Sequence, residues 1–365
     1  MRICVNGTSV ATGGGMVNLR GLLHALANVD PANEYLVLAP EGLDISLAPD
    51  VPSMLTRRIR RRPGGAAARI AWEQTALPRL LEREGIDLLF SPANLAPLRL
   101  PARRRSVVKV QNVAPFDPSG NALERGIRRK ARLRTLRRLT SAALSRADAA
   151  IFISAASREQ VKHRPDRSEV IYDGLTPVPT PPARRISILC VADFYPHKNL
   201  EVLVRGFALL PRHVREGHDL VLVGKPIVVD YANELSRLAS ALGIADNVRT
   251  VPGVQHSELA TFYAEAAVYC LPSRIEAGGT TLVEAMSAGA PVVASDLAFA
   301  REFCGDAAIY ADPLRPGAWA SAIAALLTEP ERVRTLSEAG QRQAARFTWD
   351  ACARQTLALF ESVGR

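Results

Sequence analysis

Short apolar runs alternate with longer segments of helical periodicity along the chain. It opens with RICVNG (2–7) and a glycine triplet, followed by MVNLRGLLHALANV (16–29), whose apolar residues recur at helical spacing. Strand, glycine turn and helix is how an α/β unit begins. Further strands are expected at EYLVLA (34–39), DLLFSP (87–92), SVVKVQNV (106–113), AAIFIS (149–154) and EVIYDG (169–174). This alternation predicts parallel sheets.

A proline-rich segment, TPVPTPPARR (176–185), interrupts the pattern with four prolines in seven positions. Such a segment neither packs as a helix nor sits inside a sheet, so it predicts an interdomain linker at 179–185. The pattern then restarts with strands at ISILCVA (186–192), DLVLVGK (219–225), VRTVPG (248–253), AVYCLPS (267–273) and PVVAS (291–295), separated by helical segments. We therefore expect two doubly wound α/β domains, at 1–178 and 186–346, facing each other across a cleft.

The apolar runs are short and the cysteines are scattered. AAIFISAA (149–156) is among the longest runs, well below the roughly 18 residues of a membrane span. MRICVNGTSV does not resemble a signal peptide, so a cytoplasmic protein is expected. The five cysteines lack metal-binding spacing and predict buried, reduced thiols. No HExxH or GxSxG motif supports a zinc or serine hydrolase.

Charge is divided unevenly between the two halves. Residues 1–185 hold 30 Lys and Arg against 16 Asp and Glu, whereas the remainder holds 16 against 20. Much of the excess lies in RRIRRR (57–62) and in a predicted helix at 122–144. An anionic membrane surface, nucleic acid and a plain solvated helix all remain open as explanations. The expected apolar stripe of that helix is Leu123, Ile127, Leu136, Leu139 and Ala143.

Two glutamates flank a glycine-rich turn in IEAGGTTLVEAMSAGAPVV (275–293). Glu276 is expected in the loop after a strand and Glu284 near the start of a helix. On one helix they would stand about 12 Å apart, too far for a retaining glycosidase pair, which needs about 5 Å. Thr281 and Glu284 fit a capping box. The glycines and threonines equally suit an anion site formed by backbone N–H groups at a helix start.

Two lysines follow predicted strands of the second domain. Lys198 stands in ADFYPHKNLEVL (192–203), and Lys225 directly follows DLVLVG. Two ammonium groups and a helix N-terminus at one sheet edge suit a diphosphate. A P-loop is absent, because no GxxxxGK[ST] motif occurs. In the first domain, Gly14 and Gly15 of the glycine triplet offer either a second N–H cradle or an ordinary tight turn.

Together these motifs resemble the family 4 retaining glycosyltransferases, which have the GT-B fold. The resemblance rests on SRIEAGGTTLVEAMSAGAPVVASD (273–296), the glycine loop, YPHKN (195–199), VGK (223–225) and FTWD (347–350), in family order. It covers nearly the whole chain. It implies a nucleotide-sugar donor site in the second domain and an acceptor site in the first. It also implies that the final helix, 347–365, packs back on the first domain.

The resemblance assigns roles to individual positions. Glu276 would face the transferred sugar, and Lys198 would neutralise the leaving diphosphate. Glu284 would bind the ribose of a UDP- or GDP-sugar. The other expected donor-binding residues are Gly14, Gly15, Lys225, Gly253, Val254, Gly278, Gly279, Thr280 and Thr281, with Asn94, Gln111 and Asn112 on the acceptor side. No metal or other cofactor is expected, because cationic side chains and helix ends supply the positive charge.

Three positions depart from the family pattern. Ala192-Asp193 stands where Gly-Arg is frequent, and Ala277-Gly278-Gly279 replaces Gly-Phe-Gly. Gln111-Asn112 occupies the place of a His-Asp pair, and glutamine cannot act as a general base. A front-face mechanism, in which the departing phosphate accepts the acceptor's proton, does not need that histidine.

The sequence thus predicts a retaining hexosyltransferase. It would move a mannosyl-, glucosyl- or rhamnosyl-type sugar to a glycan or lipid-linked acceptor in cell-surface polysaccharide synthesis, peripheral to the inner membrane face. One alternative is a small-metabolite glycosyltransferase, and another is a GT-B nucleotide-sugar epimerase. A third is a nucleic-acid-binding protein that uses the arginine runs, although we expect no nucleic acid because aromatic residues for base stacking are missing there.

Overall fold

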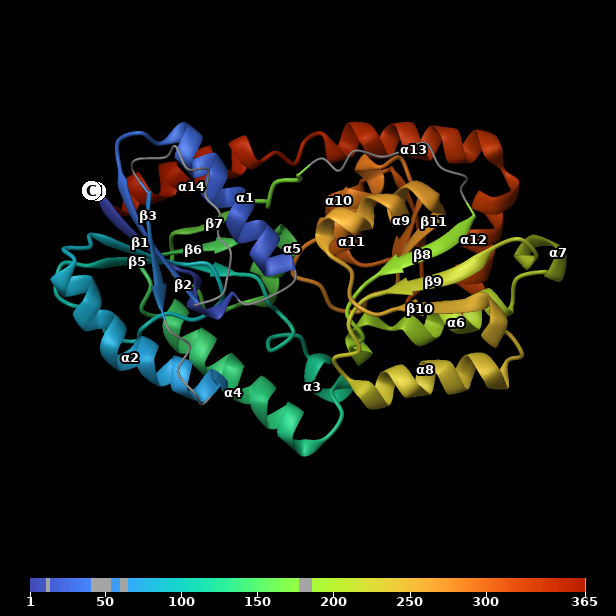
Figure 1. The fold of residues 1–365 in the computed structure, drawn as a ribbon, viewed down its shortest axis with the longest axis horizontal. Coiled ribbons are helices and arrows are strands. Elements are labelled where there is room, and N and C mark those ends of the chain that lie inside the picture. Colours follow the sequence, from blue (N-terminus) through green and yellow to red (C-terminus); the bar gives the residue numbers. More distant parts are fainter. Residues whose placement is uncertain (11–13, 41–53, 60–64, 177–185, 365) are drawn as a thin grey trace. The chain divides into compact units, whose positions relative to one another are not determined.

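The computed structural model describes residues 1–10, 14–40, 54–59, 65–176 and 186–364. The chain forms two compact units (Figure 1). Unit 1 comprises Met1–Asn121, Arg125–Thr176 and Phe347–Arg365, and unit 2 comprises Ala122–Glu124 and Pro177–Arg346. The expected linker at 179–185 and the first glycine of the triplet, Gly13, lie outside the described residues.

Unit 1 is built on a parallel sheet that has seven strands within the described residues, in the order β3-β2-β1-β4-β5-β6-β7. The strands are β1 (Arg2–Asn6), β2 (Glu34–Pro40), β3 (Met54–Ile59), β4 (Leu88–Ser91), β5 (Arg105–Val110), β6 (Ala149–Phe152) and β7 (Ser168–Val170). Its helices are α1 (Gly14–Val29), α2 (Gly65–Arg83), α4 (Ile127–Leu144), α5 (Ala155–Gln160) and α14 (Trp349–Gly364). The short helix α3 (Gly120–Leu123) is divided between the two units. The strand order reverses between β1 and β4, which are neighbours.

Helix α14 completes the core of unit 1 although it follows unit 2 in sequence. It packs against α1 (Figure 1). The Phe360 ring lies 5.2 Å from that of Phe90 on β4. The Trp349 ring lies so close to Gly21 and Gly174 that a Cβ at either position would approach it to within 2.6 Å. Because these two residues are glycines, the Trp349 ring at the start of α14 can pack against them.

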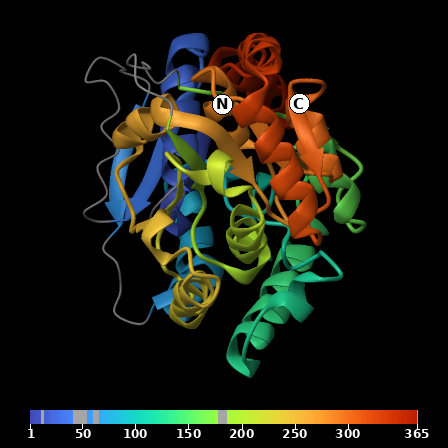
Figure 2. The same ribbon diagram turned by 90° about the vertical axis from the view of Figure 1, so that its right-hand side faces the viewer.

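The basic segment departs from its prediction. It does not form one helix over 122–144, because α3 ends at Leu123, Gly126 adopts a φ of +81° and α4 begins at Ile127. The predicted apolar stripe is only partly buried. Ile127 is 87% exposed, whereas Ala143 and Leu144 are buried. The N-terminal end of α4 extends away from the sheet of unit 1 (Figures 1 and 2), so most of its arginines face solvent.

Unit 2 has a parallel sheet of six described strands in the order β10-β9-β8-β11-β12-β13. The strands are β8 (Ser187–Val191), β9 (Asp219–Val223), β10 (Val248–Val251), β11 (Ala266–Leu271), β12 (Val292–Ser295) and β13 (Ala308–Ala311). The helices are α6 (Leu200–Ala208), α7 (Arg212–Arg215), α8 (Val229–Ala241), α9 (Leu259–Glu265), α10 (Thr280–Ser287), α11 (Ala298–Cys304), α12 (Pro316–Thr328) and α13 (Pro330–Ala344).

Burial explains why these strands read as continuous apolar runs. All five residues of β8 are buried, as are Leu220 to Val223 of β9, because helices cover both faces of a parallel sheet. Phe207, Tyr231 and Trp319 fill the core beside them. The strand order reverses between neighbouring β8 and β11. In open α/β sheets, such a switch point is where ligands bind, beyond the carboxyl ends of the strands.

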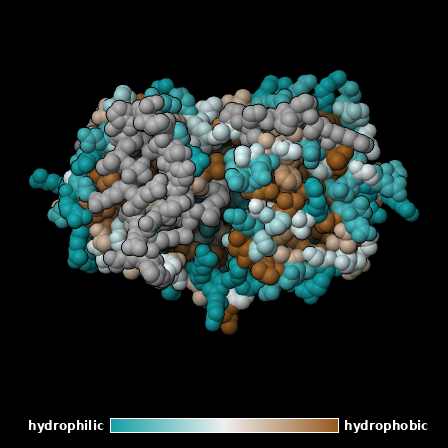
Figure 3. Space-filling view, viewed as in Figure 1, coloured by the Kyte–Doolittle hydropathy of each residue, from teal (hydrophilic) through white to brown (hydrophobic). Residues whose placement is uncertain are grey.

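Apolar surface surrounds the N-terminal end of α8 (Figure 3), where Ile227 and Val229 are 39% and 61% exposed. Throughout the described part of the chain, no helix combines the length and the apolar character that a membrane crossing requires.

Candidate functional site

Lys198 lies at the switch point of unit 2. It ends a short 3-10 turn, Pro196–Lys198, that follows β8. The next residue, Asn199, has a left-handed backbone with φ of 57° and begins α6. Its side-chain amide donates to the Pro272 carbonyl, at 3.1 Å, and to the Pro313 carbonyl, at 2.7 Å. Asn199 therefore ties the turn that carries Lys198 to the loop that follows β11.

Glu276 lies in that loop and meets Lys198 directly. The Lys198 Nζ stands 2.6 Å from the Glu276 Oε1, and the two side chains are only 18% and 17% exposed. The Arg274 N–H donates to the His197 carbonyl at 2.8 Å and joins the two loops a second time. The structure thus brings together two charged residues that are 78 positions apart in sequence.

Helix α10 begins two residues earlier than a capping box between Thr281 and Glu284 would require. Its N-cap is Gly279, no side chain caps it, and Thr280 and Thr281 occupy its first two positions. The predicted capping box between Thr281 and Glu284 is therefore wrong. A Cβ on Gly279 would lie 2.4 Å from the Phe303 ring, so the close approach of that ring requires glycine at the N-cap. The first N–H groups of α10 remain available for an external anion.

Glu284 lies in the second turn of α10 with its carboxylate buried. Its Oε2 accepts a hydrogen bond from the Tyr263 hydroxyl at 2.7 Å, and its Oε1 lies 3.7 Å from the His256 Nε2. Burial raises the pKa of Glu284, while the Tyr263 hydrogen bond and His256 act in the opposite direction. Burial also raises the pKa of Tyr263 well above its ordinary value, so that its hydroxyl stays a donor.

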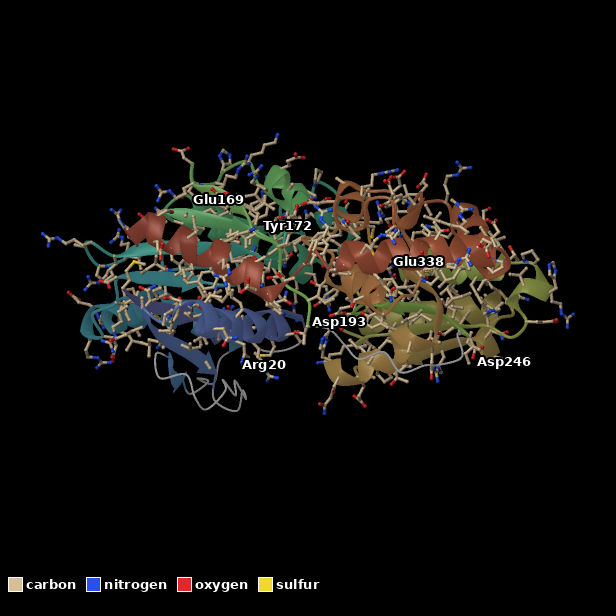
Figure 4. All side chains as sticks on the ribbon, turned by 90° about the horizontal axis from the view of Figure 1, so that it is seen from above. Arg20, Glu169, Tyr172, Asp193, Asp246 and Glu338 are labelled. Atoms are coloured by element: carbon tan, nitrogen blue, oxygen red, sulfur yellow. The ribbon has the colours of Figure 1, made fainter. Side chains whose placement is uncertain are left out.

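Lys225 and Gly253 meet at the carboxyl ends of β9 and β10. Gly253 has a φ of +52°, and a Cβ there would lie 3.0 Å from the Lys225 Cγ. The Lys225 backbone N–H donates to the Asp193 Oδ1 at 2.9 Å. Asp193, labelled in Figure 4, thus fixes the end of β9 against the end of β8. Val254, which follows Gly253, is half-buried.

The predicted residues of unit 1 follow β4 and β5. Asn94 has a left-handed backbone, with φ of 56°. Its Oδ1 accepts from the backbone N–H groups of Gln111 and Asn112, and its Nδ2 donates to the Asn112 carbonyl. Asn94 therefore shapes the 111–112 backbone. The Gln111 Oε1 would lie 3.7 Å from a Cβ on Gly15, whereas nothing lies within 4 Å of such a Cβ on Gly14.

Sequence reasoning missed Tyr263 and His256. His256 was one of six histidines without shared spacing, and Tyr263 lies in an ordinary amphipathic helix, so neither carried a signal. Within the described ranges, no three His, Cys, Asp or Glu side chains converge to hold a metal ion.

Residues 177–343, nearly all of unit 2, match the family model of the glycosyl transferases group 1. The resemblance expected from IEAGGTTLVEAM is thereby confirmed, and Lys198, Glu276 and Glu284 all lie inside the glycosyl transferases group 1 segment.

Curated relatives match nearly half of the chain. The D-inositol 3-phosphate glycosyltransferase of Segniliparus rotundus is 33% identical over 181 residues, which are 48% of this chain and 39% of that protein. The O-antigen chain mannosyltransferase B of Escherichia coli is 31% identical over 169 residues, 45% of this chain and 44% of that protein. The chain therefore spans less than half the length of each of these two relatives.

Solved structures resemble the chain over its whole length. The sucrose-phosphate synthase of Thermosynechococcus elongatus has a TM-score of 0.78 at 22% identity and covers 99% of this chain and 98% of its own. Anabaena HepE in complex with UDP-glucose has a TM-score of 0.78 at 19% identity, with 99% and 100% covered. These likenesses show that the chain has the GT-B fold, in which each unit is a Rossmann-like α/β domain.

Proposed function

We propose that the protein is a retaining glycosyltransferase. It transfers a hexose or deoxyhexose from a UDP- or GDP-sugar to a glycan or lipid-linked acceptor in cell-surface polysaccharide synthesis. The group 1 segment supports the reaction class. The name of one relative, O-antigen chain mannosyltransferase B, supports the acceptor class, and the UDP-glucose complex of Anabaena HepE supports the donor class.

The observation that carries the proposal is the Lys198–Glu276 pair at the switch point. A cation, a carboxylate and a helix N-terminus gather at the carboxyl edge of one sheet. A nucleotide sugar needs all three kinds of group. The diphosphate needs positive charge and N–H donors, whereas the sugar ring, which becomes positive as the bond breaks, needs a carboxylate.

Each residue of the site has its own role in the proposed reaction. Lys198 and the Thr280 and Thr281 N–H groups hold the diphosphate, and Glu284 accepts a ribose hydroxyl. When the bond between the anomeric carbon and the phosphate oxygen breaks, the electron pair leaves with the nucleoside diphosphate, whose growing charge Lys198 stabilises. The acceptor oxygen bonds to the anomeric carbon from the same face, and its proton passes to the departing phosphate oxygen. Glu276 faces the positive ring.

Unit 1 is proposed to bind the acceptor. Its excess of positive charge suits a phosphorylated or lipid-linked acceptor at an anionic membrane surface. Gln111 is half-buried and is the acceptor-side candidate whose side-chain amide has no hydrogen bond to another described residue, whereas the Asn94 amide already bonds to the 111–112 backbone.

A thermal-shift panel of UDP, GDP, ADP and their sugars tests the donor assignment. We expect UDP- or GDP-sugars to raise the Tm of the wild type, and Lys198→Ala and Glu284→Ala each to abolish the shift. An unchanged shift in both variants would show that the donor binds elsewhere. Activity is expected to survive EDTA. The anomeric configuration of the product, read by NMR, must match that of the donor if the enzyme is retaining.

A further inference from the structure

The two oxygens of the Glu284 carboxylate have different surroundings. Oε2 accepts a buried hydrogen bond of 2.7 Å from the Tyr263 hydroxyl. Oε1 faces His256, whose Nε2 is 3.7 Å away and whose side chain is 30% exposed, against 5% for Glu284 itself. A ligand arriving from solvent therefore meets Oε1 and the imidazole, and Tyr263 lies behind them.

Both partners of Glu284 come from one short segment. His256 begins a 3-10 turn, His256–Glu258, that leads directly into α9. Reciprocal hydrogen bonds between Gln255 and Glu258 hold the start of the turn. The Tyr263 ring of α9 packs against the Tyr269 ring of β11, with 5.7 Å between the ring centroids. Hydrogen bonds of the turn and packing of the Tyr263 ring thus hold this segment beside Glu284 before any ligand binds.

The ionisation of Glu284 depends on Tyr263 and His256. Burial raises its pKa, and the Tyr263 hydrogen bond and His256 lower it. The other titratable groups nearby are Tyr269 and Cys190, and burial raises the pKa of both, so that they stay neutral near pH 7. Glu276 is paired with Lys198. Without its own donors, a carboxylate this deeply buried tends to take up a proton.

We propose that Tyr263 and His256 are positioning residues that keep Glu284 ionised and aim its Oε1 at a ribose hydroxyl of the donor. The inference rests on the proposed function, because Glu284 must contact the donor for its state to matter. Tyr263 anchors the inner oxygen from the core, while His256 stands beside the outer one and leaves room for the sugar hydroxyl.

The chain offers a matched control for Tyr263. Tyr263→Phe and Tyr269→Phe each remove one oxygen from a fully buried ring in the same aromatic pair. The Tyr263 hydroxyl donates to Glu284, whereas the Tyr269 hydroxyl lies beside the Thr281 side chain, which affects the pKa of Tyr269. Loss of packing or of general stability therefore affects both variants, but loss of the Glu284 contact affects only one.

The test is the affinity for UDP-glucose and for GDP-mannose, measured by calorimetry between pH 5.5 and 8.5. These probes carry no phosphate group that titrates in this range. In the wild type, binding should weaken on acidification as Glu284 takes up a proton. In Tyr263→Phe the midpoint of that loss should move up by about one pH unit, a tenfold change in the ionisation equilibrium. Tyr269→Phe should follow the wild type.

Three further variants complete the experiment. Glu284→Gln should weaken binding and remove its pH dependence, and His256→Ala should weaken binding more than His256→Gln, which keeps an N–H donor. Profiles of Tyr263→Phe and Tyr269→Phe that superimpose would overturn the inference while leaving the proposed function intact. If Tyr263→Phe does not fold, Glu284→Gln provides the test. A pH profile of Glu284→Gln that matches the wild type would also overturn the inference. A wild type that binds neither probe would overturn the proposed function.

Discussion

The Lys198–Glu276 pair makes a prediction in which the two partners behave oppositely. If the ion pair holds Lys198 in place for the diphosphate, Glu276 competes with the diphosphate for that ammonium group. Lys198→Met should then weaken the binding of UDP or GDP, because the cation is gone. Glu276→Gln should strengthen it, because Lys198 is released. An ion pair with only a structural role predicts a loss in both variants.

The geometry sets the size of each effect. A hydrogen bond between charged groups contributes about 1.5–3 kcal/mol, so Lys198→Met should weaken binding roughly 10- to 150-fold at a factor of ten per ~1.4 kcal/mol. The Lys198 Nζ and the Glu276 Oε1 are 2.6 Å apart, and both side chains are mostly buried. Glutamine keeps a neutral acceptor beside that ammonium group, and a neutral hydrogen bond is weaker than a charged one by about 1 kcal/mol, so Glu276→Gln should tighten binding about fivefold.

Calorimetric titration of UDP and GDP at pH 7.5 is the assay, with Lys162→Met as the control for loss of one exposed lysine elsewhere. Thermal melts of the unliganded variants separate affinity from folding. Weaker binding in Glu276→Gln, or unchanged binding in Lys198→Met, would refute the reasoning. The sugar-transfer rate of Glu276→Gln should fall even as its nucleotide affinity rises, since the carboxylate that faces the positive ring is lost.

Three further predictions concern the framework of the two units. Gly279→Ala brings a Cβ to 2.4 Å from the Phe303 ring; we expect a loss of about 1–3 kcal/mol in the free energy of unfolding, partly recovered in the double variant with Phe303→Leu. Asn94→Ala removes three hydrogen bonds and places alanine at φ of 56°; denaturant unfolding should show a loss of at least about 2 kcal/mol. In unit 1 the Asp173 carboxylate pairs with the buried Lys109 ammonium group. Burial lowers the pKa of Lys109, but the charge and hydrogen bond of Asp173 outweigh burial, so that the pKa is raised. Asp173→Asn should cost about 3–5 kcal/mol, and a melt equal to wild type would show that the pair carries no stability.

Strand positions could be predicted from sequence more readily than strand neighbours. Lys198 and Glu276 were each expected at a strand end, but only the β8–β11 adjacency shows that they meet. Two strands were missed. Residues 54–59 of β3 carry arginines that indicated a basic cluster, and β13 is only four residues long after a glycine turn.

The capping box shows why local motifs can mislead. Thr281 and Glu284 have the right spacing, yet the helix starts at Thr280 because the Phe303 ring packs on Gly279. Glu284 then points into the core toward Tyr263, a residue 21 positions away. Phe303 and Tyr263 lie on other helices, α11 and α9, so the residues of the motif alone did not indicate where α10 begins or where Glu284 points.

The placement of α14 has a consequence for how the chain folds during synthesis. Unit 1 needs Phe360, whose ring lies against Phe90, and Trp349, whose ring lies against Gly21 and Gly174. Those residues leave the ribosome only after all of unit 2 has been made. Unit 2 can therefore complete its folding before unit 1. Until α14 has been made, the strands of unit 1 keep part of their apolar surface exposed. A chaperone that binds nascent chains would find its target in the earlier half of this protein.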